Sequence, residues 1–150
     1  MTAKILTDTK DHIYQLAKKA AEAASNKKAS DVIILSMKDL TSIADYFVIC
    51  TGDVDVHVKA IVDEIRKELK RDVKPWHIEG YHYLHWVLMD YVDFVVHVFQ
   101  KDTREYYNIE RLWADAPVER IDIQDEIIPK TDISNYTHDF SPQRNMKDDS

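Results

Sequence analysis

Apolar residues recur at helical spacing in three segments of the chain. This periodicity predicts helices over residues 10–24, from about residue 55 to residue 71, and from about residue 103 to residue 113. Short polar residues that can cap a helix precede each segment: Thr7, Asp8 or Thr9, then Asp53 or Asp55, then Asp102 or Thr103. Pro117 prevents the third helix from continuing.

Four short apolar runs alternate with these helices, at residues 32–37, 45–51, 84–90 and 94–99. Runs of this length without helical periodicity predict strands. The last two are joined by a very short connection, so they are expected to form an antiparallel hairpin. The resulting order, α-β-β-α-β-β-α, predicts an α/β fold in which helices pack on one face of a mixed sheet.

Hydrophobic periodicity is lost after Pro117. Residues 1–117 are therefore expected to form one domain, and residues 118–150 an acidic, flexible C-terminal tail. A short strand or docked arm in this tail is conceivable, formed by Ile121, Ile123, Ile127 and Ile128. Removal of residues 131–150 is expected to leave the domain folded.

Bulk properties exclude several classes of protein. The formal charge of −7 argues against a protein that holds nucleic acid by its phosphates and suits a basic protein partner. No apolar run reaches the roughly 20 residues that a membrane helix needs, and the N-terminus lacks a signal peptide pattern. The single Cys50 lies inside an apolar run and is interpreted as a buried structural thiol. We therefore expect a cytoplasmic protein.

Carboxylates after the second predicted strand offer one candidate for catalysis. Asp53 and Asp55 are spaced to hold Mg²⁺ for phosphoryl transfer, with Asp93 as a third candidate. However, the chain has only two glycines, which cannot form a phosphate-binding glycine loop. Helix capping by Asp53 and Asp55 is the favoured interpretation. A metal-dependent nucleotidyltransferase that uses these two residues is kept as the alternative function.

Histidines cluster before the third predicted strand. His77, His82 and His85, with Glu79 between them, carry metal-ligating groups, but their spacing matches no compact zinc pattern. Loop histidines without a metal are the favoured interpretation. No metal, cofactor or catalytic residue is therefore predicted.

Aromatic residues crowd the hairpin. If Tyr91 and Val92 are the two central turn residues, Trp86 pairs with His97, and the hairpin has two faces. We assign one face to the helices: His85, Val87, Met89, Phe94, Val96 and Val98. The other face is expected to be left uncovered by helices and to meet a partner: Leu84, Trp86, Leu88, Val95, His97 and Phe99. The predicted partner-binding residues are Trp86 as the anchor, with Leu88, Tyr91 and His97 around it. The competing interpretation is that Trp86 is core.

Several ordered motifs resemble one protein family. They are Ala44-Asp45-Tyr46-Phe47-Val48-Ile49-Cys50-Thr51-Gly52, His57-Val58-Lys59-Ala60-Ile61, Glu79-Gly80, the stretch from Trp86 to Phe99, Arg104-Glu105-Tyr106-Tyr107 and Leu112-Trp113-Ala114-Asp115-Ala116-Pro117. Together they span about residues 10–117. This pattern resembles the ribosomal silencing factor family, also called the Iojap-related family.

The resemblance implies a fold related to nucleotidyltransferases but without their activity. It further implies binding to the large ribosomal subunit through large-subunit ribosomal protein fourteen, at the face where the small subunit docks. Such binding would block subunit joining and repress translation. A role in ribosome assembly is a weaker alternative. No sequence-specific nucleic acid binding and no membrane contact are expected, and a homodimer is compatible with the sequence.

Two positions depart from the family pattern. The family usually has glycine where this chain has Val92, and a β-branched residue resists the positive φ that such a turn needs. A wider turn, or a turn of another type, is therefore expected. After Gly52 the family usually has small hydroxyl residues and an arginine, whereas this chain has Asp53-Val54-Asp55-Val56.

Overall fold

The structure is a computed structural model that describes the backbone of residues 2–121 and the side chains of residues 12–121. Its elements follow in the order α1 (Thr2–Asn26), β1 (Ser30–Ser36), β2 (Tyr46–Gly52), α2 (Asp55–Leu69), β3 (His77–Glu79), β4 (Trp86–Asp90), β5 (Phe94–Gln100), α3 (Lys101–Tyr107), α4 (Ile109–Leu112) and β6 (Val118–Arg120). No helix in this described part is long and apolar enough to cross a membrane.

The strands form one mixed sheet, as predicted. Their order in the sheet is β3-β4-β5-β2-β1-β6. The central pair, β2 and β5, is parallel, and every other neighbouring pair is antiparallel. Because β2 and β5 run in the same direction, the chain must cross over between them, and α2 lies on that crossover. The α/β class is thereby confirmed, whereas the nucleotidyltransferase-like comparison stays a prediction.

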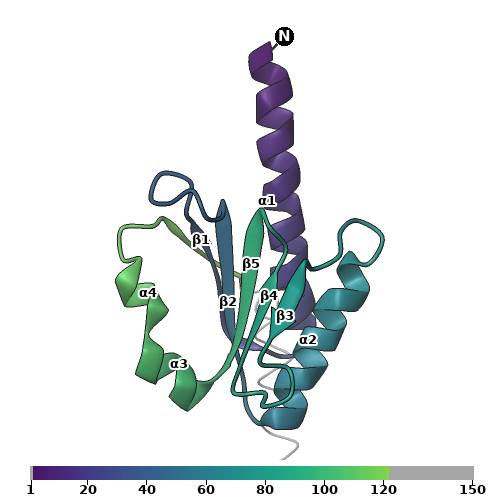
Figure 1. Ribbon diagram of the computed structural model, residues 1–150, viewed down its shortest axis with the longest axis vertical. Coiled ribbons are helices and arrows are strands. Elements are labelled where there is room, and N and C mark those ends of the chain that lie inside the picture. The colour runs from purple at the N-terminus through teal and green to yellow at the C-terminus, as the bar shows by residue number, and fades with distance from the viewer. Residues whose placement is uncertain (1, 122–150) are drawn as a thin grey trace, which may run out of the picture.

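Helices α1 and α2 cover one face of the sheet (Figure 1). The predicted apolar stripe of α2 is fully buried there: Val58, Ile61, Val62, Ile65 and Leu69. Helix α1 contributes small residues, which let its backbone approach the strands closely: Ala17, Ala20, Ala21, Ala23 and Ala24. Cys50 is buried in the same core, and burial raises the pKa of its thiol to about 12. Its structural role is as expected.

Helix ends differ from the sequence prediction in three places. Helix α1 begins at Thr2, so the expected capping residues of its start lie inside the helix. The residue that caps α2 is Val54, and no side chain caps that helix by a hydrogen bond, so the predicted cap by Asp53 or Asp55 is wrong. The third helix is two helices, α3 and α4, because Asn108 adopts a left-handed conformation with φ 45°.

Two strands were not predicted, and both are at sheet edges. Strands β3 and β6 have three residues each, which is too short for a periodic signal. Strand β6 pairs with β1, and the backbone N–H of Ile121 donates to the carbonyl of Val32 at 2.9 Å. Residues 118–121 therefore belong to the folded domain rather than to a tail. Residues 122–150, with the expected flexible tail and Ile123, Ile127 and Ile128, lie outside the described residues.

Candidate protein-binding surface

The hairpin of β4 and β5 has two faces that divide its side chains as predicted. Along β4, Val87 and Met89 are fully buried under the helices, whereas Trp86 and Leu88 are half-buried on the opposite side. We call this opposite side the tryptophan face, made of Trp86, Leu88, Val95, His97 and Phe99. The helix-covered face holds the remaining apolar residues of the two strands: Val87, Met89, Phe94, Val96 and Val98.

The register of the hairpin differs from the prediction by two residues. Trp86 pairs with Phe99, and Leu88 pairs with His97. The turn is centred one residue later than predicted, on Val92 and Asp93, because the Tyr91 N–H donates to the Phe94 carbonyl at 2.9 Å. It is therefore not wider than two residues, and Val92 has a φ of 74°. Because side chains alternate with a period of two, a shift of two keeps the residues of β4 and β5 on their predicted faces. Leu84, which precedes β4, packs instead against the helix-covered core, so its predicted place beside Trp86 is wrong.

Tyr91 does not extend the tryptophan face, so its predicted placement is wrong. Its side chain is buried in the core under the helices, 3% exposed, with its ring stacked on Phe94 at 4.8 Å. Burial raises the pKa of its hydroxyl to about 12. The later position of the turn explains this placement, because Tyr91 pairs with Phe94 and continues the β4 alternation toward the helix side.

Trp86 lies at the centre of an aromatic cluster. Its indole stacks on Phe99 at 4.8 Å with an interplanar angle of 27°, and it contacts Tyr107 of α3 at 4.9 Å. Its Nε1–H donates a hydrogen bond to Nδ1 of His97 at 3.2 Å. One ring face is thus packed and the polar atom is satisfied. The residue remains only half-buried, as an interface anchor needs.

His97 holds the indole from the interior. It is 4% exposed and is packed edge-on against Phe47 at 4.8 Å. Because its Nδ1 accepts from Trp86, its proton is on Nε2, and that atom has no hydrogen-bond partner within residues 12–121. Burial lowers the pKa of His97 from 6.5 to about 4, so the ring is neutral at physiological pH.

Helices α3 and α4 cover part of the tryptophan face, which the sequence analysis did not expect. Ile109 and Trp113 pack against its core, and the Trp113 ring meets Phe47 edge-on at 6.3 Å. Figure 1 shows the two helices on the side of the sheet away from α1 and α2. The expectation of a face free of helices is therefore wrong in part: the centre is covered, and Trp86 and Leu88 remain accessible.

Arg104 fixes α3 and α4 against the sheet. Its guanidinium forms a bidentate ion pair with Glu110, with Nε at 2.8 Å and Nη2 at 3.1 Å from the carboxylate oxygens. Its Nη1 donates to the carbonyl of Asp31 at 2.9 Å and to the hydroxyl of Thr51 at 2.8 Å. This side chain, 11% exposed, connects both helices to β1 and β2 and so positions Tyr107 beside Trp86.

The rim of this surface contains apolar residues that sequence reasoning did not assign to it. Tyr106, Tyr107 and Leu112 are 81%, 54% and 73% exposed. In the continuous helix predicted there, Tyr106 would share one face with Ile109 and Trp113, whereas in the structure Ile109 and Trp113 pack on the core and Tyr106 is exposed. The signal that was available is Asn108, because asparagine is among the few residues that readily adopt the left-handed conformation that breaks the helix.

Gly80 positions the start of β4. Its φ is +82°, and a Cβ at this position would lie 2.1 Å from the carbonyl oxygen of Trp86. The loop can approach the strand that closely only with glycine. The Glu79-Gly80 motif thus has a physical role in holding the backbone of Trp86.

The carboxylates of the alternative, enzymatic function do not converge. Asp55 accepts a hydrogen bond from Gln100, and the Asp53 side chain is 83% exposed, with its backbone N–H bound to Nδ1 of His57. Asp93 precedes β5 whereas Asp53 follows β2. Because these strands are parallel and in register, Asp53 and Asp93 lie at opposite ends of them, about 20 Å or more apart along the strand direction.

The histidine cluster is likewise dispersed. His77 pairs with Glu79 at 2.7 Å, whereas His82 and His85 are exposed in the loop before β4. Within residues 12–121, no group of three or more histidine, cysteine, aspartate or glutamate side chains is placed to hold a metal ion.

Comparisons with known proteins agree on one family. The family model described as "Ribosomal silencing factor during starvation" matches residues 10–149. The ribosomal silencing factor RsfS of Bacillus subtilis is 44% identical over 108 residues, which cover 71% of this chain and 92% of that protein. The chloroplastic Iojap protein of Zea mays is 32% identical over 108 residues, which cover 66% of this chain and 44% of that longer protein.

Solved structures support the same relationship. A crystal structure of a Chromobacterium violaceum protein matches with a TM-score of 0.66 and 38% identity, over 68% of this chain and 86% of that one. A crystal structure from Bacillus halodurans matches with a TM-score of 0.62 and 39% identity, over 74% of this chain and 99% of that one. The chain therefore belongs to the ribosomal silencing factor family.

Proposed function

We propose that this protein binds the large ribosomal subunit through large-subunit ribosomal protein fourteen and sterically blocks joining of the small subunit. Membership of the ribosomal silencing factor family carries the proposal, because the relatives are named for silencing the ribosome. A protein acting in this way works in the cytoplasm and represses translation without an enzymatic step.

The tryptophan face supplies the binding surface in this proposal. Trp86 and Leu88 contact the partner, with Tyr107 beside them, because these side chains combine a packed core with an accessible edge. His97 acts from the interior by orienting the indole through the Nε1–H···Nδ1 hydrogen bond. Tyr91 is left out because its side chain is buried under the helices.

Trp86→Ala tests this surface directly. Truncation of an interface anchor costs about 2 kcal/mol or more, so affinity for isolated ribosomal protein fourteen should fall by about thirtyfold in calorimetric titration. The matched control is Trp76→Ala, which removes an indole that is 71% exposed and lies outside the tryptophan face. Unfolding by urea separates lost binding from lost structure.

Subunit joining gives the functional readout. Wild-type protein should co-sediment with large subunits but not with small ones, and should lower the fraction of joined ribosomes when subunits are mixed. Trp86→Ala should fail in both assays, whereas Trp76→Ala should still prevent joining when it is saturating. Normal joining at saturating wild-type protein would refute the proposal.

Absence of enzymatic turnover is a separate test. Mg²⁺ with a nucleoside triphosphate should leave the melting temperature unchanged, because a genuine ligand stabilises the native state by mass action. Turnover of a nucleoside triphosphate that Asp53→Ala with Asp55→Ala abolishes would establish the alternative nucleotidyltransferase function.

A further inference from the structure

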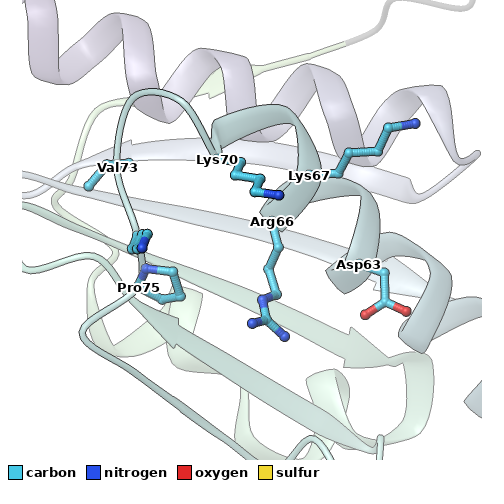
Figure 2. A pocket seen from close by; sticks show the side chains of 7 residues that line it. Asp63, Arg66, Lys67, Lys70, Val73 and Pro75 are labelled. Carbon is cyan, nitrogen blue, oxygen red and sulfur yellow. The ribbon is translucent and has the colours of Figure 1, made fainter.

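A basic pocket lies at the end of α2, away from the tryptophan face. Its volume is about 570 Å³, and Figure 2 shows the lining side chains on the last turns of α2 and on the segment that follows. The lining residues are Asp63, Arg66, Lys67, Lys70, Val73, Lys74 and Pro75. Four cations and one carboxylate give this pocket a formal charge of +3 in a chain whose formal charge is −7.

The nearby carboxylates form ion pairs with other residues, whereas the cations of the pocket do not. Within residues 12–121, Arg66, Lys67, Lys70 and Lys74 form no ion pair and no side-chain hydrogen bond. Asp63 pairs with Lys59 at 2.9 Å and accepts from the hydroxyl of Tyr81 at 2.7 Å. Asp72 pairs with Lys19 at 2.9 Å. Within the described part of the chain, the positive charge of the pocket is therefore not neutralised by an ion pair.

Helix stability does not account for this arrangement. Cations in the last turn interact favourably with the helix dipole, which explains one or two of them. However, Arg66 and Lys70 are four residues apart, a spacing at which like charges repel along the helix. Lys74 lies beyond the end of α2 and gains nothing from the dipole. The set as a whole fits a ligand better than it fits the helix.

An exposed indole follows the pocket-lining segment directly in the sequence. Trp76 follows Pro75 directly, is 71% exposed, and contacts the His77 ring edge-on at 4.7 Å. Its backbone N–H donates to the carbonyl of Asp90 at 2.7 Å, which fixes the residue at the β3 edge of the sheet. An exposed aromatic ring on the chain segment that lines a basic pocket is a combination suited to single-stranded nucleic acid, which binds by base stacking and phosphate contact.

We propose that the basic pocket and Trp76 bind a single-stranded segment of RNA, with phosphates on the cations and a base on the indole. The net charge of the chain does not oppose this, because charges farther apart than about 8 Å are largely screened at physiological ionic strength. The choice of RNA rests in part on the proposed function, since a protein that binds the large ribosomal subunit meets RNA there. This contact does not depend on the nucleotide sequence of the RNA. It gives the protein a second point of attachment to the large subunit, beside ribosomal protein fourteen.

Fluorescence anisotropy with labelled oligouridylate tests the proposal on the intact chain. Binding should be measurable at low salt and should weaken with salt, with a log–log slope of roughly −2 to −3 for three or four phosphate contacts. Lys67→Glu with Lys70→Glu should weaken binding by at least about tenfold, because it replaces two phosphate contacts by repulsion. Trp76→Ala should weaken binding by about fivefold or more.

Lys27→Glu with Lys28→Glu is the charge-matched control. Both residues are exposed in the loop after α1, and the change in net charge is the same. This variant should bind oligouridylate within about twofold of wild type. Equal losses in the two double variants, or no binding by the wild-type chain at low salt, would overturn the proposal. Equally tight binding of polyglutamate, unaffected by Trp76→Ala, would show an acidic protein site instead.

The two surfaces can be tested apart from each other. Trp86→Ala should keep full affinity for oligouridylate while its affinity for ribosomal protein fourteen falls. Lys67→Glu with Lys70→Glu should do the reverse. A wild-type chain that binds oligouridylate but not ribosomal protein fourteen would count against the proposed function alone, whereas loss of RNA binding in both variants would count against the assignment of the basic pocket.

Discussion

The two faces of the same sheet differ in chemistry more than in shape. The helix-covered face is a continuous apolar core to which α1 and α2 contribute complete stripes, and its hairpin residues are aliphatic except for the stacked pair Tyr91 and Phe94. The tryptophan face is smaller, includes a buried histidine, and is covered only by two short helices that Asn108 separates. Strands β4 and β5 contribute alternate residues to both.

This difference shows how one hairpin can serve both folding and recognition. Burial under long helices stabilises the native state but leaves nothing for a partner to contact. A face that is packed at its centre and accessible at Trp86 and Leu88 loses some stability from incomplete burial, yet it presents rigid apolar groups to a partner. The comparison predicts opposite consequences for substitutions that are neighbours in the sequence.

Phe94→Ala should produce the largest effect on stability. The Phe94 side chain is 1% exposed and stacks on Tyr91, so its truncation leaves a cavity in the helix-covered core. We expect a loss of about 3–5 kcal/mol in the free energy of unfolding, measured by urea denaturation.

Leu88→Ala on the opposite face is the comparison variant for Phe94→Ala. Because Leu88 is half-buried, its truncation should cost about 1 kcal/mol. The same substitution should weaken binding to ribosomal protein fourteen, while Phe94→Ala should affect binding only through unfolding. Equal losses of stability at the two positions would contradict the division of the hairpin into two unlike faces.

The buried histidine makes the tryptophan face the acid-sensitive one. The pKa of His97 is about 4 in the folded protein and 6.5 as its ordinary value, so the unfolded state binds the proton first. The free energy of unfolding therefore keeps its full value, as far as His97 is concerned, above pH 6.5, and it decreases progressively as the pH falls toward 4. The loss should amount to about 2 kcal/mol at pH 5 and about 3 kcal/mol at pH 4.

His97→Phe isolates this contribution. Urea unfolding of both proteins between pH 7.5 and pH 4.5 should show a flatter pH dependence in the variant, because the titrating group is gone while the aromatic volume stays. Carboxylates titrate in both proteins and cancel in the difference. If the two pH profiles are parallel, the ring of His97 is not held neutral by burial.

The sequence predicted those parts of the fold that carry a periodic signal. The stripe of α2, the four longer strands and the two faces of the hairpin follow from spacings of 3.6 and 2 residues. Strands β3 and β6, at three residues each, show no period, and they form only because a neighbouring strand offers its backbone. Such pairing is a tertiary effect that local sequence does not encode.

The candidate surface was predicted at its centre and missed at its edges. Trp86 and Leu88 share a face because alternation along one strand fixes it, and His97 joins them because the register shift of two residues is even. Tyr91 was misplaced because the turn is centred one residue later than predicted, on Val92 and Asp93. The role of Tyr107 depends on Arg104, whose contacts with Glu110 and with the sheet join residues distant in the sequence. Long-range polar contacts of this kind leave no local pattern.

Val92→Gly should produce the smallest effect, and an increase in stability. Val92 lies in the turn where the two faces of the hairpin meet, with a φ of 74° that a β-branched residue adopts only at a cost. An L-residue in this region is strained by about 1–2 kcal/mol, and glycine loses about 0.5–1 kcal/mol through its larger unfolded-state entropy. Because the valine side chain is 59% exposed, little burial is lost. The net gain should be about 0.5–1 kcal/mol in the free energy of unfolding.

Val92→Ala separates strain from side-chain removal in this prediction. Alanine keeps a Cβ and therefore most of the strain, so it should give little or none of the gain. The backbone N–H of residue 92 donates to Asp90 Oδ1 at 2.8 Å, and this hydrogen bond is available in all three proteins. Since the Val92 side chain lies on neither face, affinity for ribosomal protein fourteen should not change. A gain of equal size in Val92→Ala would place the effect in the unfolded state or in the lost side chain, and the turn would then not be strained.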